Sequence, residues 1–528
     1  MTEIEFKKHL WVAANKLRGS LSAAEYKYPV LGLVFLKYVS DIFKVQRDVI
    51  VSRMADPDSD MYIDDEELRA EAVDVMVEDR DSYTQDNVFW IPTEARYSDI
   101  LKQASNTKIA SILDNAMSAI EKENPKLVGV LYRDFGRLSI DSGKLGDLIE
   151  IIGRMTFNPI DHHSRDIFGE VYEYFLGNFA LEEGQKAGQF YTPRSIVQTL
   201  VDILAPFEGR IYDPACGSGG MFVYSERFIE EHGGKKGQAV IFGQEMTDTT
   251  RKMACMNLAI RGIDYDLGKK PADTFNDDQH PNLRADYILA NPPFNLKNWG
   301  AKALASDPRW EYGAPPEGNA NYAWLQHILA RLSTNGRAGV VLANGSTSSN
   351  TSGEGDIRKA MVKGDVVECM VALPGQLFTN TQISACLWFL SKNKAAGKNG
   401  NHDRRNQVLF IDARKLGDMI SRKQMAFGVD DIKLIAQTYH NWRDTQWGEG
   451  DYQNLDGFCN SASLADIEKQ GFTLTPGRYV GAEEVEDDGV PFEEKMGILT
   501  GLLKTNLEQS DQLAADLKNN LAGLGYEL

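Results

Sequence analysis

The stretch GRIYDPACGSGGMFVYSERF, residues 209–228, decides the fold class. It opens with a short strand-forming run that ends in Asp213, and glycines follow at positions 217, 219 and 220. Glycine tolerates the backbone angles of a tight turn and lets a ligand approach the backbone closely. A helical apolar pattern then begins at Met221. We therefore expect a strand, a glycine-rich turn and a helix, which together form one unit of an open α/β sheet with a ligand at the turn.

Strand and helix patterns alternate from about residue 160 to residue 412. This alternation predicts a mainly parallel α/β sheet. The polar stretch at 391–407, which is rich in Lys, Gly and Asn, is predicted to be an exposed loop. The strand-forming runs are GRIYD, AVIFGQ, ADYILA, AGVVLA, DVVECMVAL and ACLWFL, and helical patterns such as MFVYSERFIEEH and RKMACMNLAI lie between them.

Helical patterns dominate both flanks, so we divide the chain into domains at 1–155, 156–480 and 481–528. In the first domain, YPVLGLVFLKYVSDIF is apolar nearly all round, as a buried helix would be. The acidic stretches at 56–67 and 78–86 are predicted to be loops. The last domain follows the acidic linker GAEEVEDDG. Its helix either packs on its own domain or docks on a partner, and its apolar positions include Met496, Leu499, Leu503, Leu513 and Leu517.

The composition is that of an ordinary soluble protein, with a net charge of -19 and a pI of about 5.0. Domains that bind DNA unaided are usually basic, so a local patch or a partner would have to supply the phosphate contacts. The five cysteines form no CxxC pair and the histidines form no HxxxH, which argues against a structural metal site. With no signal-peptide pattern and no early apolar run long enough to span a bilayer, we expect a cytoplasmic protein without a membrane segment.

Three acidic residues each lie at the end of an α/β unit, and the third, Asp273, comes just before the strand pattern that ends in NPPF. Asp213 would repel a phosphate but hold an ammonium group, and Glu245, which lies 32 residues later, is placed to accept hydrogen bonds from ribose hydroxyls. Asp273 in ADTF is placed to accept one from an adenine amino group. Any one of them alone would be read as a loop residue or a helix cap. Three in series predict a ligand with an amino-acid portion, a ribose and an adenine, such as S-adenosylmethionine.

The motif NPPF, residues 291–294, ends the strand pattern ADYILA because proline cannot continue a ladder. The Asn291 side-chain carbonyl and the Pro292 backbone carbonyl can together accept two hydrogen bonds from one exocyclic amino group. That arrangement leaves the nitrogen lone pair available for attack on a methyl sulfonium. Phe294 can stack on a flat base that has left the duplex. The alternative, a proline-ended strand with a core Phe, is disfavoured by the acidic series that precedes the motif.

In order, the motifs GQFYTPRSIV (188–197), DPACGSGG (213–220), FGQE (242–245), ADTF (272–275) and NPPF resemble those of N6-adenine DNA methyltransferases. Within that group the chain resembles the modification subunit of type I restriction–modification systems, and LRGSLSAAEYKYPVLGLVFLKYVSD (17–41) resembles the N-terminal domain of those subunits. The resemblance implies a Rossmann-like class I methyltransferase domain that uses S-adenosylmethionine. It also implies a mainly α-helical N-terminal domain and a C-terminal helical tail.

The resemblance also implies the site residues. Asn291, Pro292, Pro293 and Phe294 would be catalytic, and Phe378 would be a second aromatic beside the target base. From the residues alone, Ser195 is a candidate cap for the helix that follows QFYTPR. The cofactor-binding residues would be Gln189, Phe190, Tyr191, Thr192, Pro193, Arg194, Asp213, Pro214, Ala215, Gly217, Ser218, Gly219, Gly220, Glu245, Asp273 and Asn291.

No large DNA-reading domain is evident after ACLWFL, which agrees with a family in which a separate specificity subunit reads the DNA. The resemblance implies a restriction subunit for translocation and cleavage, and two copies of this chain in each methyltransferase complex that acts on double-stranded DNA. The segment 295–322 is either a mobile loop over DNA or a solvated loop. In the first case its possible phosphate contacts are Lys297, Lys302 and Arg309.

Two other functions remain open. NPP-aromatic motifs also serve methylation of a glutamine side-chain amide in proteins, although the long chain and its flanking regions argue against that reading. A cofactor-binding assembly subunit without chemistry of its own is the third possibility, and a chain that is inactive without its partner is a related case.

Overall fold

The computed structural model of the protein describes residues 11, 12, 15, 23–138, 140–154, 174, 175, 192–378, 384–397, 401–421, 424–482 and 492–523. By its internal contacts the chain divides into two compact units, Met1–Gly481 and Ala482–Leu528. None of the described helices combines the length and the apolarity that a membrane crossing needs. The described residues also hold no cluster of metal-ligating side chains.

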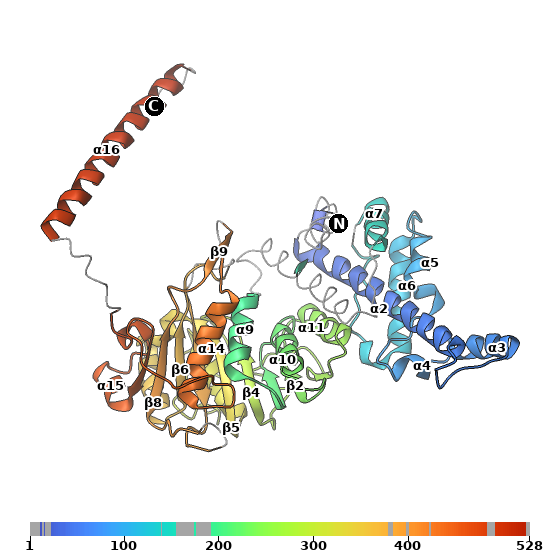
Figure 1. Ribbon diagram of the computed structural model, residues 1–528, viewed down its shortest axis with the longest axis horizontal. Helices are drawn as coiled ribbons and strands as arrows, with labels where there is room; N and C mark the ends of the chain where they lie inside the picture. The colour runs from blue at the N-terminus through green and yellow to red at the C-terminus, as the bar shows by residue number, and fades with distance from the viewer. Residues whose placement is uncertain are drawn as a thin grey trace. The chain divides into compact units, whose positions relative to one another are not determined.

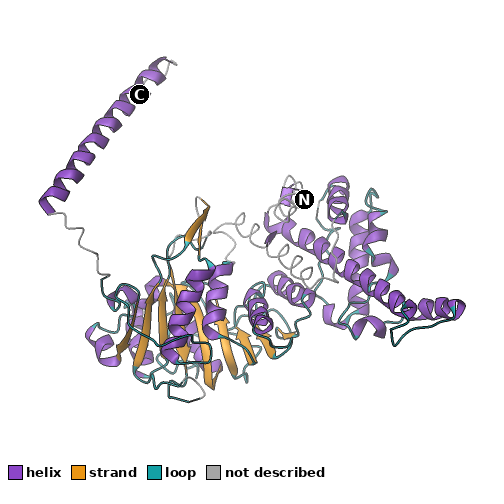
Figure 2. Ribbon diagram, in the orientation of Figure 1, coloured by secondary structure: helices purple, strands orange, loops and turns teal. Residues whose placement is uncertain are grey.

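A mixed sheet forms the centre of the first unit (Figures 1 and 2), and its order is β11-β8-β6-β7-β5-β4-β1-β2-β3. Neighbouring strands are parallel except that β7 runs antiparallel to β5 and β6, and β11 to β8. The strands are β1 (Gly209–Asp213), β2 (Ala239–Gly243), β3 (Tyr265–Asp266), β4 (Ala285–Ala290), β5 (Leu332–Ala343), β6 (Val367–Ala372), β7 (Ala385–Ser391), β8 (Gln407–Asp412) and β11 (Cys459–Ser463), with a separate hairpin of β9 (Asp418–Ser421) and β10 (Gln424–Ala426).

The strand order reverses at β1, and this reversal positions the site. The chain moves outward from β1 to β2 and β3, and then returns to β4 on the other side of β1. Because β2 and β4 both run parallel to β1, the carboxyl ends of these three strands share one edge of the sheet. Ligands of open α/β sheets bind outside such an edge, at the point where the strand order reverses.

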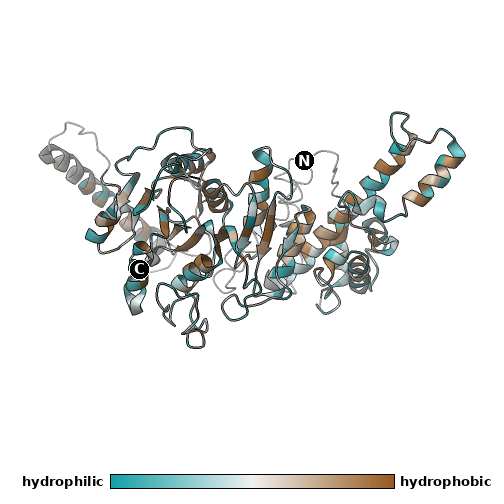
Figure 3. Ribbon diagram, turned by 90° about the horizontal axis from the view of Figure 1, so that it is seen from below, coloured by the Kyte–Doolittle hydropathy of each residue, from teal (hydrophilic) through white to brown (hydrophobic). Residues whose placement is uncertain are grey.

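Helices cover both faces of the sheet, because successive side chains of a strand point to opposite faces. In β1, Ile211 belongs to the larger hydrophobic core, and Tyr212 packs with α12 and α13 in a second core. The central strands are mostly hydrophobic in Figure 3, and every residue of β6 and β7 is buried. The predicted α/β arrangement is therefore confirmed. The helices are α9 (Arg194–Leu204), α10 (Gly220–Glu231), α11 (Asp248–Ile260), α12 (Asn321–Arg331), α13 (Glu354–Lys363), α14 (Val429–Arg443) and α15 (Leu464–Lys469).

The N-terminal part is helical, as predicted. The acidic stretches are not wholly loops, however. The Asp65 side chain accepts hydrogen bonds from the N–H groups of Glu67 and Leu68 and so starts α3, and α4 lies within the second stretch. Aspartate is a favourable N-cap, so an acidic run can begin a helix as well as separate two. The helices are α2 (Ala23–Ala55), α3 (Glu66–Met76), α4 (Asp81–Thr84), α5 (Tyr97–Leu101), α6 (Ile109–Glu123) and α7 (Ser142–Gly153).

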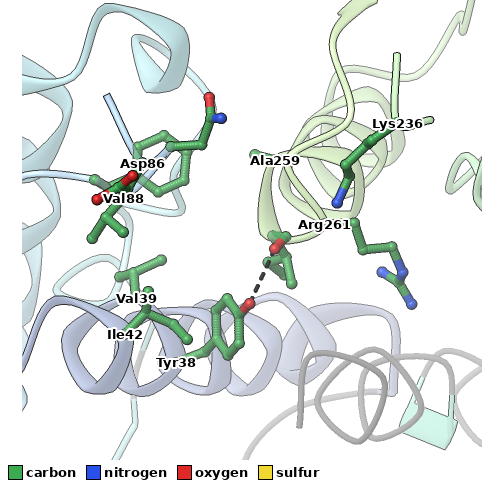
Figure 4. A pocket seen from close by; sticks show the side chains of 12 residues that line it. Tyr38, Val39, Ile42, Asp86, Val88, Lys236, Ala259 and Arg261 are labelled. Carbon is green, nitrogen blue, oxygen red and sulfur yellow. Dashed lines mark hydrogen bonds between the residues drawn. The ribbon is translucent and has the colours of Figure 1, made fainter. Parts of the chain in front are cut away.

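Helix α2 packs on the central domain at α11. Tyr28 donates a hydrogen bond to Thr249 over 2.8 Å, and Tyr38 donates one to the Ile260 carbonyl over 3.1 Å. A pocket at this junction is lined by side chains of α2, residues 86–89, Lys236 and the end of α11 (Figure 4). Because α11 follows β2, it begins near the carboxyl edge and ends near the opposite edge. The pocket therefore lies away from the strand ends that precede Asp213 and Glu245.

The second unit contains the predicted C-terminal helix, α16 (Phe492–Gly523). Five large apolar side chains of this helix, among those that the structure describes, are exposed. The exposed ones are Met496, Leu503, Leu507, Leu513 and Leu517.

A buried ionic cluster joins β6 to α14 and to the segment before β8. Glu368 of β6 has no solvent exposure and accepts a hydrogen bond from the Tyr439 hydroxyl over 2.7 Å. Arg443 and Arg404 form ion pairs with the same carboxylate. Burial alone would raise the pKa of Glu368, but the neighbouring arginines hold that pKa below its ordinary value. The predicted exposed loop at 391–407 is therefore wrong for Arg404, which is buried against β6.

Replacing Glu368 with Gln should leave two buried guanidinium groups without their counter-charge. We expect the free energy of unfolding to fall by about 3–5 kcal/mol, as is typical when one partner of a buried pair is removed. Urea unfolding of the purified chain measures this change. Glu449→Gln, which removes an exposed carboxylate paired with Lys433, is the matched control and should change the value by less than about 1 kcal/mol. Equal effects of the two substitutions would contradict the assignment.

Candidate active site

The glycine turn after β1 makes an open cradle. Gly217 and Gly219 have φ angles of 54° and 80°, which side-chain-bearing residues rarely adopt, and Gly220 begins α10. A Cβ atom added at Gly217 or Gly220 would meet nothing within 4 Å. The turn is fixed from below, since the Asn257 side chain donates a hydrogen bond to the Ser218 carbonyl over 2.8 Å. The side of the turn at Gly217 and Gly220 is therefore open to close contact with a ligand.

Asp213 and Glu245 meet across this turn. The Asp213 carboxylate is 2% exposed and accepts a hydrogen bond from the Ala215 N–H over 2.9 Å. Glu245 lies two residues after β2, and its carboxylate accepts hydrogen bonds from the N–H groups of Gly217 over 3.1 Å and Thr247 over 2.9 Å. The structure thus brings together two of the three acidic residues that the sequence singled out.

Both carboxylates are costly to ionise where they lie. Burial raises the pKa of Asp213 to about 8, which the Ala215 N–H opposes and the charge of Glu245 reinforces. Burial likewise raises the pKa of Glu245, against the hydrogen bonds from Thr247 and Gly217. A ligand that carries an ammonium group and hydroxyl donors would favour the ionised forms. The side chains at this edge accept hydrogen bonds through the Asp213 and Glu245 carboxylates. They therefore fit the ammonium group and the ribose hydroxyls of S-adenosylmethionine.

The ADTF segment packs against the glycine turn. The Thr274 hydroxyl donates a hydrogen bond to the Pro214 carbonyl over 2.5 Å, and the Ala272 N–H donates one to the Glu245 carbonyl over 3.1 Å. One carboxylate oxygen of Asp273 accepts hydrogen bonds from the N–H groups of Phe275 and Asn276. Asp273 thus caps its own turn beside the cradle, and its contact with an adenine stays a prediction.

NPPF follows β4 at the same edge. The Asn291 side-chain nitrogen donates a hydrogen bond to the Thr192 hydroxyl over 2.8 Å, which fixes the orientation of the amide. The Asn291 side-chain oxygen is buried and has no hydrogen-bond partner among the residues that the structure describes. Pro292 is buried and Pro293 is half-buried. Buried acceptors are nearly always satisfied, and leaving one unpaired costs about 1–3 kcal/mol. The Asn291 oxygen is therefore suited to receive a donor from a ligand.

Two aromatic rings stand beside Asn291. Phe294 and Phe378 contact each other edge to face, with ring centroids 5.8 Å apart and planes 77° apart. Phe378 comes from the loop that follows β6, 84 residues after Phe294 in the sequence. The two rings are nearly buried, at 9% and 6% exposure. A base that stacks on either ring must replace part of this contact.

The last set of predicted cofactor-binding residues, 189–194, precedes α9 in the sequence and includes its first residue. Pro193 is the N-cap and Arg194 the first residue of α9, so the predicted cap at Ser195 is wrong. Ser195 lies inside the first turn, where its hydroxyl is buried without a partner among the described residues. The exposed Arg194 guanidinium lies 5.7 Å from the centre of the Tyr224 ring. Gln189, Phe190 and Tyr191 lie outside the described residues.

Arg309 is not a phosphate contact, contrary to the prediction. Its side chain is 9% exposed and ion-paired with Asp307. Its guanidinium donates hydrogen bonds to the carbonyls of Thr274 over 3.2 Å and Phe275 over 2.6 Å. It also contacts His327, whose pKa burial lowers to about 3, so this imidazole is neutral and can accept. Arg309 therefore clamps the ADTF turn from the segment that follows NPPF.

The rest of that segment is also anchored. Trp299 and Trp310 pack with Phe275 and Trp324 in a small hydrophobic core. Lys302 is exposed and pairs with Glu317 over 3.3 Å, and Lys297 is exposed. The sequence offered no signal for this role, because Gly, Pro and Asn dominate the segment and its partners lie far away in the chain.

The N-6 DNA methylase family matches residues 163–488, and the HsdM N-terminal domain family matches residues 6–152. The chain is 52% identical to the Type I restriction enzyme HindI methylase subunit of Haemophilus influenzae, over 79% of this chain and 93% of that protein. It is 37% identical to the Type I restriction enzyme MjaIX methylase subunit of Methanocaldococcus jannaschii, over 99% of this chain and 92% of that protein. The crystal structure of the type I restriction-modification system methyltransferase subunit from Streptococcus thermophilus shares the fold, with a TM-score of 0.72, 24% identity, and coverage of 91% of this chain and 100% of that one.

Asp213→Asn should stabilise the ligand-free protein in a pH-dependent way. The Asp213 pKa is about 8 in the folded chain against an ordinary 3.8, so the wild-type protein loses stability as pH rises between these values. Asn keeps the acceptor for the Ala215 N–H but cannot ionise. The gain in Tm should therefore grow from pH 5 to pH 8 and then level off. Thermal unfolding at several pH values measures it, with the exposed Asp264→Asn as the control. A gain that is independent of pH would contradict the buried charge.

Proposed function

Because the chain belongs to the methylase subunits of type I restriction enzymes, we propose that it transfers a methyl group from S-adenosylmethionine to N6 of adenine in DNA. Family membership confirms the resemblance inferred from the motifs, and with it a role as a DNA methyltransferase subunit. The methyl donor, the target atom and the division of labour among subunits are the finer parts of the proposal. The observation that carries the methyl donor and the target atom is the unpartnered Asn291 oxygen at the edge that also holds Asp213 and Glu245.

In the proposed binding mode, Asp213 accepts the ammonium group of the methyl donor and Glu245 accepts hydrogen bonds from its ribose. The glycine turn at 217–220 receives the donor closely, and Asp273 lies where its adenine would extend. Bound there, S-adenosylmethionine supplies an electrophilic methyl group on a sulfonium. The raised pKa of Asp213 supports this mode, since a cationic partner removes the cost of ionising a buried carboxylate.

Asn291 would act on the target amino group. Its oxygen and the Pro292 carbonyl accept the two N–H donors, which turns the nitrogen lone pair toward the methyl donor. The hydrogen bond between Asn291 and Thr192 supports this role, because it holds the amide with its oxygen free to accept. Phe294 and Phe378 would hold the base after it leaves the duplex, at a cost of a few kcal/mol for unstacking.

We propose that a separate specificity subunit reads the DNA and that a restriction subunit acts in the same complex, with two copies of this chain. The net charge of -19 supports the first point, because a chain this acidic attracts duplex DNA poorly by itself. The exposed apolar side chains of α16 support a docking role for that helix. The five cysteines are all free in the structure, which is compatible with the reducing cytoplasm as its place of action.

Asn291→Ala should bind the methyl donor as the parent does but lose methylation by about 100-fold or more, the scale seen when one preorganised polar group is removed. Asn291→Asp keeps an acceptor oxygen of the same reach, so it should retain more activity than Ala. Calorimetry measures donor binding, and transfer of a labelled methyl group to DNA measures the rate, both in the complex with the specificity subunit. Methylation of DNA by the Ala variant at the parent rate would refute the role. Label on a protein glutamine instead of DNA would favour the alternative substrate.

Arg309→Lys should raise the KM for the methyl donor with little change in kcat, because lysine cannot reach both carbonyls of the ADTF turn while pairing with Asp307. Arg309 is a positioning residue in this account. Arg405→Lys is the matched control, since Arg405 makes the same fork to an aspartate two residues earlier but is exposed. Steady-state kinetics of the complex distinguishes the two. A loss confined to kcat, or identical behaviour of the two variants, would contradict the clamp.

A further inference from the structure

The hairpin of β9 and β10 stands apart from the main sheet, and Figure 1 shows it projecting from the central domain. Every residue of β9 is exposed. Met419 and Ile420 are 47% and 62% exposed, although successive strand residues point to opposite faces. Both faces of this strand therefore present a large apolar side chain to solvent. Met425 of β10 packs against the larger core, whereas the two adjacent apolar residues of β9 do not. Single exposed apolar residues are ordinary, but two adjacent ones on a hairpin outside the main sheet indicate a partner.

The base of the hairpin, in contrast, is firmly held. Phe427 is buried, and Leu416 packs against the larger core. Gly417, with a φ of 92°, passes beneath the Ala426 carbonyl, so a side chain here would be strained. The exposed part of the hairpin therefore extends from a base that is packed against the core.

The hairpin begins at the edge of the sheet that carries the site. Strands β4, β5, β6 and β8 point the same way, so NPPF, the loop with Phe378 and the hairpin all follow strand ends on one edge. The Met425 N–H donates a hydrogen bond to the Gln376 carbonyl over 3.0 Å. Gln376 is two residues before Phe378, which packs on Phe294. One backbone hydrogen bond thus joins the hairpin to the loop that carries Phe378.

The local charge favours duplex DNA as the occupant. Residues 412–426 contain four basic residues and two acidic residues, in a chain whose net charge is -19. Arg414 is ion-paired with Asp412, and Arg422 and Lys423 lie outside the described residues. Proteins that unstack or kink a duplex insert apolar side chains such as Ile and Met between base steps. An apolar pair within a basic segment, beside a site for an extrahelical base, matches that chemistry.

We propose that the hairpin β9–β10 enters duplex DNA beside the target adenine, and that Ile420, the more exposed of the two apolar residues, occupies the space in the stack that the adenine leaves. This inference rests on the proposed function. The wedge offsets part of the cost of unstacking, and the hydrogen bond between Met425 and Gln376 couples its entry to the aromatic pair. The hairpin is a positioning element, because it touches the duplex and not the reacting atoms.

The test uses the complex with the specificity subunit and a duplex that contains its mapped methylation site. The double variant Met419→Ser/Ile420→Ser should methylate the paired duplex at least about 10-fold more slowly, which corresponds to about 1.4 kcal/mol. On a duplex with an abasic position opposite the target adenine, where little pairing must be broken, its rate should be within about 3-fold of the parent. Val128→Ser/Val240→Ser, at two exposed valines outside the hairpin, is the control and should match the parent on both duplexes.

A second measurement separates this inference from the methylation proposal. The parent complex should raise the fluorescence of 2-aminopurine placed at the target position, and the double variant should not, whether or not a methyl group is transferred. Equal loss of rate on both duplexes, an unchanged rate on the paired duplex, or loss of binding to the specificity subunit would each overturn the wedge. Failure of the parent to methylate adenine in either duplex would instead overturn the proposed function.

Discussion

The hydrogen bond from the Gly217 N–H to the Glu245 carboxylate is the contact on which the site depends. It joins the ends of β1 and β2 across the glycine turn, and it requires the left-handed backbone of Gly217. Thr274 and Ala272 extend the same network to the ADTF turn by binding the Pro214 and Glu245 carbonyls. Because the strand order reverses at β1, the NPPF motif after β4 lies at the other side of the turn. The strand order therefore places the glycine turn and the NPPF motif at one edge of the sheet.

The electrostatic character of this edge follows from the same geometry. Asp213 and the Asn291 oxygen are buried acceptors and Glu245 is a half-buried one. Backbone N–H groups bind the two carboxylates, and the Asn291 oxygen has no partner among the described residues. Such an arrangement weakens the ligand-free protein and favours ligands that bring their own N–H, O–H and ammonium groups. The polar clusters around Glu368 and Arg309 stabilise the fold, because their charged side chains pair with each other: Glu368 with Arg443, and Arg309 with Asp307. The fold thus separates groups that hold the sheet together from groups that remain available for ligands.

Local patterns in the sequence predicted much of this arrangement. The strand–turn–helix of residues 209–228 and the strands on both sides of it are local signals, and they lie where they were expected. Asp213 and Glu245 lie on either side of the glycine turn, and the role of Asp273 stays a prediction. The errors at Arg404 and Arg309 share a physical cause, which is that partners distant in the sequence decide the outcome. The errors at Asp65 and Ser195 are instead local ones of helix capping. Glu368 occupies a strand whose counter-charges come from α14 and the loop before β8, and Arg309 lies in a loop-like segment yet binds carbonyls at 274 and 275. The hairpin also escaped prediction, because short strands without a buried face lack periodicity.

The central claim is that this edge directs a methyl group to the exocyclic amine of adenine in DNA. The most direct measurement incubates the complex of this chain and its specificity subunit with duplex DNA and S-adenosylmethionine that carries a trideuterated methyl group. Digestion to nucleosides and mass spectrometry then identify the labelled product. The account predicts that the label is recovered as N6-methyldeoxyadenosine. Label on cytosine, label on a protein glutamine, or DNA without label under conditions where the donor binds would contradict it.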